Sequence, residues 1–561
     1  MALINGSAQR LRIGREEAAF ALVPAIVLFA LAIRLPVGLD LSDEAYYATF
    51  IDDWLKGGIA SSTLDTLHQT AALLVYPAAI MFSWFKGSSE GLFLFLRVVF
   101  LIGALASGTL WIVFLRRLGW SWQAWLSGAC LIAYIPFGLP APSYNTLGLQ
   151  GLIIGLAGYG CGSLASIASA QRGWFALSVA AWGAATIAYP PLIVPLFALC
   201  LADFLISKER TWRGAFPVSA ALTAAAGWSA TIFLLSAQRL WDGIVYLSLI
   251  TSSDQFGRKI WFTIDLLRLN PAFASLCVLA ALLGLVRNRL DPRLVATAIT
   301  AILLSSLILT PALYVRSHDV VVLMALCGLG LLAKLRKASD ASDRLVAVIY
   351  AISLLAGIVT AATAYNSIYN FCIGGLPAAS LALLARGQSQ TRHWRWFQTF
   401  ALAAFLAAIL STSLLVHYGE LPGASRQRIH QGFFAGIHAR PDDIALLEQV
   451  RQSMRALAKP PASIVVVSRL PGIVLETGAR VKMRTPFPLV LNVSDSGLAA
   501  TYRFYDEPLN RPEAIVIYED RYYRPITPIS PGLIASYTKT TQVEAGLGQL
   551  SLLVRPRNIA P

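Results

Sequence analysis

Charged residues are scarce in this sequence. Only 13% of its 561 residues are Asp, Glu, Lys or Arg, whereas 56% are hydrophobic. A soluble globular domain carries roughly 25% charged residues. Apolar runs recur from Ala18 to Val416, and several reach the ~20 residues that a helix needs to cross a ~30 Å hydrocarbon layer. The scarcity of charge therefore excludes an ordinary soluble protein and predicts a polytopic α-helical membrane protein.

Cysteine is also scarce. The six cysteines all lie in apolar segments, and none has the close spacing of a metal cluster: Cys130, Cys161, Cys200, Cys277, Cys327 and Cys372. They are interpreted as small core residues. The last ~140 residues contain no cysteine, which excludes a disulfide-stapled domain there. The sequence has no internal repeat and no low-complexity tract.

Acidic residues are outnumbered, with 30 against 45 basic residues and a net charge of +15. In a soluble protein this excess would suggest nucleic acid. Here the basic residues cluster between apolar runs, where the preference of Lys and Arg for the cytoplasmic face explains them. Nucleic acid is therefore not expected as a partner. Arg10, Arg12 and Arg15 precede an apolar run too long for a cleaved signal peptide, so that run is expected to stay as the first helix.

The alternation of apolar runs and basic clusters predicts about thirteen spans, with the N-terminus cytoplasmic. Residues 1–416 form this transmembrane domain. The expected spans are Ala18–Leu39, Gly91–Leu115, Trp122–Phe137, Leu147–Ala168, Trp174–Ala188, Leu192–Ile206, Ala215–Ser236, Ala272–Leu285, Leu294–Leu309, Val320–Leu332, Leu345–Ala362, Phe371–Leu384 and Phe397–Val416.

Two long loops are predicted on the external side, residues 40–90 and 237–269. The apolar stretch from Ala71 to Phe85 is too short for a span, so the first loop is expected to lay two helices on the membrane. The other of these helices covers Ala45 to Lys56. The second loop carries aromatic residues that suit a lid resting on lipid: Trp241, Tyr246, Phe256 and Trp261.

The composition changes after His417. Residues 417–561 are rich in Pro and Arg and contain three short β-branched runs that predict buried strands: Ser463–Val467, Ala514–Tyr518 and Leu550–Val554. The stretch from Pro441 to Leu457 has helical periodicity, with Asp442 and Asp443 in its first turn. A small external α/β domain is expected.

The most informative polar stretch follows the first span. Asp43 and Glu44 are adjacent carboxylates in Ser42-Asp43-Glu44-Ala45-Tyr46-Tyr47, at the external face. One interpretation is structural, with Asp43 as the N-cap of the following helix and Glu44 in its first turn. The other is catalytic, because a carboxylate pair at a partly desolvated rim can act as a base. Asp52 and Asp53, further along this helix, are expected to face solvent.

The order of motifs around this stretch resembles the N-terminal half of GT-C-type glycosyltransferases. The resemblance rests on Arg34, the acidic stretch, Gly57-Gly58 after an interfacial helix, Leu96-Arg97 and Arg116-Arg117. It is strongest to the bacterial membrane transferases that include lipid A aminoarabinose transferase, and more distant to protein O-mannosyltransferases. It is clearest over residues 30–170, and it implies a location in a bacterial cytoplasmic membrane with the C-terminal domain in the periplasm.

The resemblance implies an inverting transfer of a hexosyl or pentosyl group from a polyprenyl-phosphate carrier. The acceptor would be a glycolipid, polysaccharide or protein at the outer face. Asp43 would be the general base, with Glu44 as its supporting neighbour. A phosphate leaving group needs only positive charge and N–H donors. Arg316 and His318 could clamp it, although an interfacial Arg that snorkels to water is an equal alternative. Arg258 and Lys259 are further candidates that lipid headgroups would also attract.

Other polar residues have weaker assignments. Arg34 and Arg97 lie in apolar segments and are expected to pair with acids of the first loop. Relatives often carry a second acid where this sequence has Tyr144-Asn145, which puts a divalent metal site in doubt because hard cations favour several carboxylates. The residues left as candidate substrate contacts are Tyr46, His68, Tyr144, Asn145, Tyr365 and Asn366.

Two other classes remain open. A secondary transporter or lipid-linked sugar flippase would also be polytopic, but it would usually show repeated halves and binding groups near the midplane. A non-catalytic envelope assembly factor could keep the fold without the chemistry. Charges concentrated at the outer rim, next to an external domain, favour an interfacial enzyme.

Overall fold

The computed structural model describes residues 15–206, 215–250, 255–309, 313–337, 340–364, 366–384, 392–416, 425–485, 495–520 and 527–556. Every expected span coincides with a helix there. These helices are α1 (Arg15–Arg34), α4 (Leu92–Arg117), α5 (Trp122–Ala133), α6 (Tyr144–Ser163), α7 (Ala168–Ala188), α8 (Ile193–Ile206), α9 (Ala215–Leu235), α12 (Pro271–Val286), α13 (Pro292–Leu309), α14 (Leu313–Cys327), α16 (Ala341–Thr363), α17 (Phe371–Leu383) and α18 (Arg392–Leu415).

The chain is a multi-pass helical membrane protein. Within the described residues, seven helices are long and apolar enough to cross a membrane, and three shorter apolar helices accompany them. The total of thirteen spans stays a prediction, because several of the helices fall short of that length or hydropathy.

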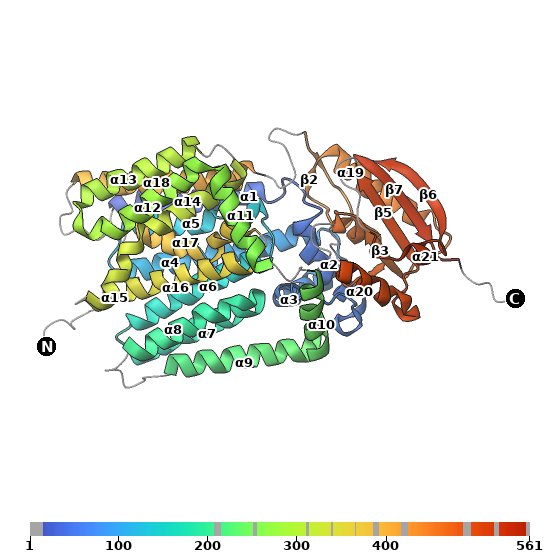
Figure 1. The fold of residues 1–561 in the computed structure, drawn as a ribbon, viewed down its shortest axis with the longest axis horizontal. Coiled ribbons are helices and arrows are strands. Elements are labelled where there is room, and N and C mark those ends of the chain that lie inside the picture. The colour runs from blue at the N-terminus through green and yellow to red at the C-terminus, as the bar shows by residue number, and fades with distance from the viewer. Residues whose placement is uncertain are drawn as a thin grey trace.

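The long helices run side by side, and the C-terminal sheet lies at one end of the bundle (Figure 1). Glycines bring α6 close to α7. A Cβ on Gly155 would come within 2.7 Å of the Trp182 ring, and one on Gly151 within 2.9 Å of the Ala181 carbonyl oxygen. Small residues at such contacts let two helix backbones approach closely. Trp182 of this pair belongs to the same buried hydrophobic core as Trp111 of α4 and Tyr350 of α16.

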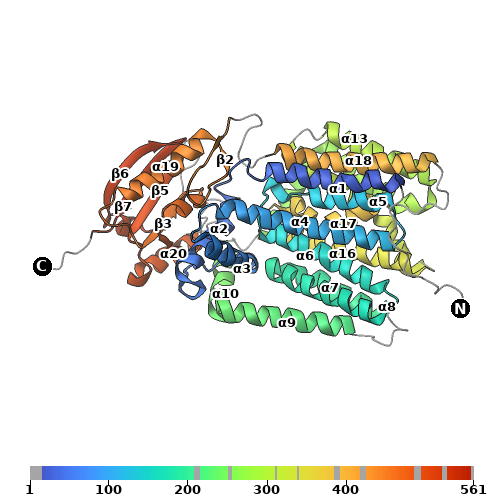
Figure 2. The same cartoon turned by 180° about the vertical axis from the view of Figure 1, so that it is seen from behind.

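The two loops expected outside the membrane contain helices. α2 (Asp43–Gly57) and α3 (Gln69–Lys86) confirm the two helices expected between residues 40 and 90. The segment from residue 237 to 269 forms α10 (Ala237–Ile250) and α11 (Gln255–Leu269), with Trp241 and Trp261 more than half exposed. Seen from behind, α2, α3 and α10 lie between the bundle and the sheet (Figure 2).

The C-terminal region, residues 425–556, contains a mixed sheet of five strands in the order β4-β3-β5-β7-β6. The three expected strands are β3 (Ser463–Val467), β5 (Ala514–Asp520) and β7 (Gly548–Val554), joined by β4 (Arg480–Val481) and β6 (Thr538–Ala545). β3 pairs in parallel with β4 and β5, whereas β7 is antiparallel to β5 and β6. The region also contains β1 (Gln427–Arg428), β2 (His438–Ala439), α19 (Pro441–Arg455), α20 (Asp495–Asp506) and α21 (Pro531–Ile534). The short helix α15 (Lys334–Lys337) lies between α14 and α16 in the chain.

Backbone hydrogen bonds join the C-terminal region to the loop that carries α2. The His438 N–H donates to the Pro36 carbonyl at 2.6 Å, and the Gly38 N–H donates to the His438 carbonyl at 2.9 Å. Further along, the Gly91 N–H donates to the Gly432 carbonyl at 3.0 Å. One hydrophobic core contains residues of α2, α3, β3 and β5 together. The C-terminal region is therefore built onto the loop of residues 36–91.

Candidate functional site

The N-terminus of α2 is capped by Asp40. Its carboxylate accepts hydrogen bonds from the backbone N–H of Ser42 at 2.9 Å and from that of Glu44 at 2.7 Å. Ser42 occupies the N-cap position without a side-chain capping bond, and Asp43 is the first helical residue. The structural interpretation of Asp43 as the N-cap is therefore wrong. Asp43 stands exposed in the first turn of the helix.

Asp40 is a site residue that the sequence interpretation did not assign. It is 7% exposed, and burial, followed by the nearby Asp43 carboxylate, raises its pKa to about 7. Two neighbouring carboxylates disfavour each other's negative charge. The Asp-x-Ser spacing just before an acidic first turn is the signal that could have found it, because Asp often accepts backbone bonds two residues ahead.

Glu44 is buried against Arg97 of α4. Arg97 Nε donates to Glu44 Oε1 at 2.6 Å and Arg97 Nη2 donates to Glu44 Oε2 at 2.6 Å. The expected pairing of Arg97 with an acid of the first loop is confirmed. Because both carboxylate oxygens are engaged, Glu44 holds the start of α2 in place. This arrangement agrees with a supporting rather than a chemical role.

Aromatic rings line the space beside Asp43. The Tyr47 and Tyr144 rings are 6.2 Å apart, and the His68 ring lies 5.5 Å from Tyr46 and 5.2 Å from Tyr144. Burial raises the pKa of Tyr47, followed by the neighbouring Tyr144 and Tyr46 and then by the Asp43 carboxylate. Desolvation lowers the pKa of His68 to about 4, so this ring is neutral at pH 7. Tyr46, His68 and Tyr144 are thus brought together, and Tyr144 also lies within electrostatic reach of Asp43.

Two asparagines extend this cluster. The side-chain amide of Asn370 donates to Asn145 Oδ1 at 3.3 Å. The ring of Tyr189, at the end of α7, lies 4.9 Å from Tyr144 and was not anticipated as a site residue. Asn366 is exposed four residues before Asn370, in the same connection between α16 and α17. Tyr365 lies outside the described residues.

Arg316 and His318 lie near the start of α14. Arg316 Nε is buried and, within the described residues, donates no hydrogen bond. His318 is 1% exposed and enclosed by the rings of Phe137, Tyr134 and Tyr369, at 4.8, 6.1 and 5.9 Å between centroids. His318 Nε2 is likewise buried and has no hydrogen-bond partner within the described residues. The two side chains differ in exposure, because Arg316 is half-buried whereas the His318 ring is enclosed by aromatic rings.

The remaining basic candidates are less informative. Arg258 and Lys259 belong to α11, but their side chains lie outside the described part of the chain. Arg34, 5% exposed, donates to the backbone carbonyls of Ser413 at 2.9 Å and Gly138 at 3.0 Å. Arg34 thus ties the ends of α1, α5 and α18 together.

The expectation that Asp52 and Asp53 face solvent is wrong. They are 1% and 0% exposed. Asp52 pairs with Lys56 Nζ at 2.6 Å, and Asp53 Oδ1 accepts from the Val481 N–H at 3.1 Å. The C-terminal region covers this face of α2, which a helix pattern alone does not reveal.

The residues at the start of α2 do not fit a divalent metal. Asp40 accepts hydrogen bonds from its own turn, and both oxygens of Glu44 are engaged by Arg97. A hard cation would need several carboxylate oxygens turned toward one point. In the described part of the chain, no group of three or more His, Cys, Asp or Glu residues could hold a metal ion.

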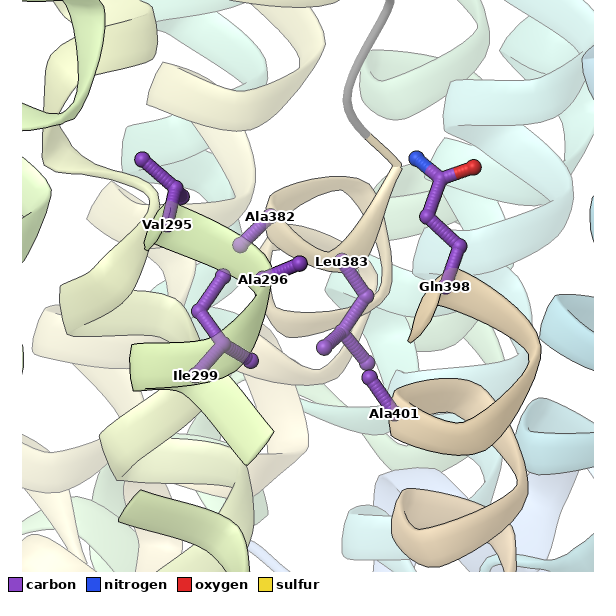
Figure 3. A pocket seen from close by; sticks show the side chains of 7 residues that line it. All are labelled: Val295, Ala296, Ile299, Ala382, Leu383, Gln398 and Ala401. Atoms are coloured by element: carbon purple, nitrogen blue, oxygen red, sulfur yellow. The ribbon is translucent and has the colours of Figure 1, made fainter. Parts of the chain in front are cut away.

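A small pocket within the bundle lies apart from this cluster. It is lined by residues of α13, α17 and α18: Val295, Ala296, Ile299, Ala382, Leu383, Gln398 and Ala401 (Figure 3). Gln398 is its sole polar lining side chain, and it accepts a hydrogen bond from Gln123 at 3.4 Å. The pocket offers no acid or base for chemistry.

No protein-family model matches the sequence, and no curated protein matches it either. Solved structures do resemble it. ArnT from Cupriavidus metallidurans bound to undecaprenyl phosphate superposes with a TM-score of 0.52 at 12% identity, covering 97% of this chain and 98% of that one. At this identity the likeness shows the fold. The chain therefore has the GT-C-type fold that the sequence resemblance implied.

Two further structures are similar at lower scores. The oligosaccharyltransferase of Archaeoglobus fulgidus in complex with Zn and sulfate has a TM-score of 0.48 at 12% identity, covering 88% of this chain and 68% of that one. The arabinofuranosyltransferase AftD from Mycobacteria has a TM-score of 0.46 at 13% identity, covering 97% of this chain and 40% of that one.

Proposed function

We propose that this protein is an integral membrane glycosyltransferase. It transfers a sugar from a polyprenyl-phosphate carrier to an acceptor hydroxyl of a cell-envelope glycolipid, polysaccharide or protein at the outer face of the cytoplasmic membrane. The observation that carries the proposal is the exposed Asp43 at the start of α2, in a turn fixed by Asp40 and by the Arg97–Glu44 pair. The GT-C-type fold supports the same reaction class.

Asp43 is the general base in this proposal. As the acceptor oxygen attacks the anomeric carbon, its proton passes to the Asp43 carboxylate, and the bond from that carbon to the phosphate oxygen breaks. The polyprenyl phosphate leaves with the electron pair. A single displacement of this kind inverts the anomeric centre. Correctly placed general bases contribute about 10²- to 10⁴-fold in rate.

Arg316 is the proposed partner of the leaving phosphate. Its guanidinium has a buried Nε without a protein acceptor in the described part of the chain. Burying such a donor without a partner costs free energy, which a phosphate oxygen would recover. His318, which aromatic rings enclose, is then a packing residue. The neutral His68 and the rings of Tyr46 and Tyr144 form an uncharged wall suited to a sugar.

The proposed orientation places the N-terminus in the cytoplasm and the C-terminal region outside. It follows from the basic clusters between the helices. In this orientation α10 and α11 lie at the outer surface, where exposed Trp241, Trp261 and Leu269 would contact lipid.

Replacement of Asp43 tests the proposal. Purified Asp43→Asn protein should lose at least about 100-fold in kcat with polyprenyl-phosphate sugars while its thermal midpoint does not fall, because the change relieves the repulsion between Asp43 and Asp40. Asp495→Asn is the matched control, because Asp495 is also exposed and also begins a helix, α20. A wild-type rate in Asp43→Asn would rule out the base assignment. Solute uptake into vesicles without transfer would instead favour a transporter.

A further inference from the structure

The start of α2 is contacted by a turn of the C-terminal region. The backbone N–H of Gly472 donates to the carbonyl oxygen of Leu41 at 2.8 Å. Gly472 lies in the short 3-10 helix Pro471–Glu476, which follows β3 and is buried throughout. Leu41 is two residues before Asp43, so this bond fixes the backbone that enters the acidic turn.

The contact leaves no room for a side chain on residue 472. A Cβ there would lie 2.7 Å from Ala45 Cβ, 3.0 Å from Leu41 Cδ2 and 3.0 Å from the Leu41 carbonyl oxygen. The last of these atoms is backbone, which cannot swing aside. The φ of Gly472 lies outside the left-handed region, so the glycine is required for close approach and not for its backbone angle.

The contact between Gly472 and Leu41 belongs to a larger interface between α2 and the C-terminal region. Two more hydrogen bonds connect α2 with the C-terminal region. The Val481 N–H donates to Asp53 Oδ1 at 3.1 Å, and Lys56 Nζ donates to the Ala479 carbonyl oxygen at 3.2 Å. These bonds engage the C-terminal half of α2. Gly472 engages the other half, where Asp43 stands. The C-terminal region therefore contacts both halves of α2.

We propose that Gly472 is a positioning residue for the Asp43 base, and that the C-terminal region thereby completes the catalytic turn. The inference rests on the proposed function. Asp43 lies between Leu41 and Ala45, the two residues that Gly472 touches. A methyl group on residue 472 would push this turn away by a few tenths of an ångström or more. Since a 1 Å misplacement can cost about 100-fold in rate, the loss should appear in kcat.

The experiment compares Gly472→Ala with Gly532→Ala in the full-length protein. Gly532 is exposed, and a Cβ there would meet nothing within 4 Å. Gly472→Ala should lower kcat about 10- to 100-fold and leave the donor KM within twofold of wild type, because the proposed phosphate group lies on α14. Gly532→Ala should behave as wild type.

A compensating variant separates positioning from general damage. Ala45→Gly removes the methyl group that Gly472→Ala would strike, so the double variant should recover at least part of kcat, despite the ~1 kcal/mol helix cost of glycine. If Gly472→Ala is not obtained folded, Ala45→Ser adds one atom on the α2 side of the same contact and should lower kcat in the same way.

Hydrogen–deuterium exchange gives a readout independent of catalysis. Peptides covering residues 39–50 should exchange faster in Gly472→Ala than in wild type or Gly532→Ala. Wild-type kcat and unchanged exchange in Gly472→Ala would overturn the inference while leaving the proposed function intact. Absence of transfer by the wild-type protein would overturn the function, and the exchange of residues 39–50 would still decide whether Gly472 holds this turn.

Discussion

Arg97 binds Glu44 through two parallel hydrogen bonds, each 2.6 Å long, with both side chains buried. The same guanidinium donates to the carbonyls of Leu35 at 2.5 Å and Gly38 at 2.8 Å. One side chain of α4 thus ties the end of α1 to the start of α2. A planar guanidinium suits this task because its donors point in fixed directions.

Breaking this ion pair should destabilise the protein. Glu44→Gln leaves the buried Arg97 charge uncompensated, which costs about 3–5 kcal/mol. A marked drop in the thermal midpoint should accompany any loss of transfer. Glu90→Gln, an exposed glutamate of the same loop, is the control. A variant with normal thermal stability and abolished kcat would instead assign Glu44 a chemical role.

Arg316 should affect donor binding more than the chemical step. Arg316→Gln removes a charge-assisted hydrogen bond to phosphate, worth about 1.5–3 kcal/mol, so the donor KM should rise roughly 10- to 100-fold with a smaller change in kcat. The control is Arg268→Gln, because Arg268 is exposed and its nitrogen lies 3.8 Å from the carboxylate of Asp265, which is also exposed. Equal donor KM values in the two variants would exclude Arg316 as the phosphate partner.

The charge on Asp40 should make stability depend on pH. Its pKa of about 7 in the folded protein lies above the ordinary value of 3.8. The stabilisation from the protonated form is therefore fully present below pH 4 and is lost as pH rises through 7. The Asp40→Asn variant has no carboxyl group to ionise at this position. Between pH 6 and pH 8 its free energy of unfolding should therefore rise by roughly 1 kcal/mol relative to that of the wild type. Thermal midpoints measured at both pH values check this, and a constant difference would contradict it.

Arg484 should matter more at high pH than at low pH. Its side chain pairs with Asp65 at 2.6 Å, and burial raises the pKa of Asp65 to about 6 despite this partner. Without the arginine the pKa of Asp65 rises further, so at pH 8 the variant either buries a carboxylate that has lost this partner or protonates it at a free-energy cost, whereas at low pH Asp65 is a neutral acid in both proteins. Arg484→Ala should therefore lower the thermal midpoint at pH 8 and much less at pH 5.

Adding Asp65→Asn to the Arg484→Ala variant provides the control. This second change removes the carboxylate that the arginine neutralises. The double variant should recover most of the thermal midpoint lost at pH 8. Equal destabilisation by Arg484→Ala at the two pH values would show that the arginine acts through packing alone.

The helices were the most predictable part of the fold. Apolar runs locate every expected membrane helix, because the bilayer demands continuous apolar surface and internal hydrogen bonding. β3, β5 and β7 were predictable as short β-branched runs. β6 was missed since its sequence, Thr538–Ala545, is polar and mostly exposed at the sheet edge. Periodicity detects a strand by its alternation of apolar and polar residues, and in β6 only Ala545 is fully buried.

The site was predictable only in part. The Asp43–Glu44 stretch and the Arg97 pairing followed from local sequence and apolar context. The burial of Asp52 and Asp53 did not, because their cover comes from residues near 481. Asp40 was overlooked because its capping role is recognised from its hydrogen bonds to the N–H groups of Ser42 and Glu44. The neighbourhood of Tyr189 with Tyr144 likewise depends on how α6 and α7 pack.

The bond between Asp53 and Val481 joins residues that are 428 positions apart. A ribosome adds roughly 5–20 residues per second, so α2 exists for about 20 to 90 seconds before its cover is synthesised. During that interval Asp53 and the Leu41 carbonyl have no partner from the C-terminal region. The acidic turn can thus reach its final geometry only when almost the whole chain has been made. Biogenesis itself delays the assembly of the site until the protein is nearly complete.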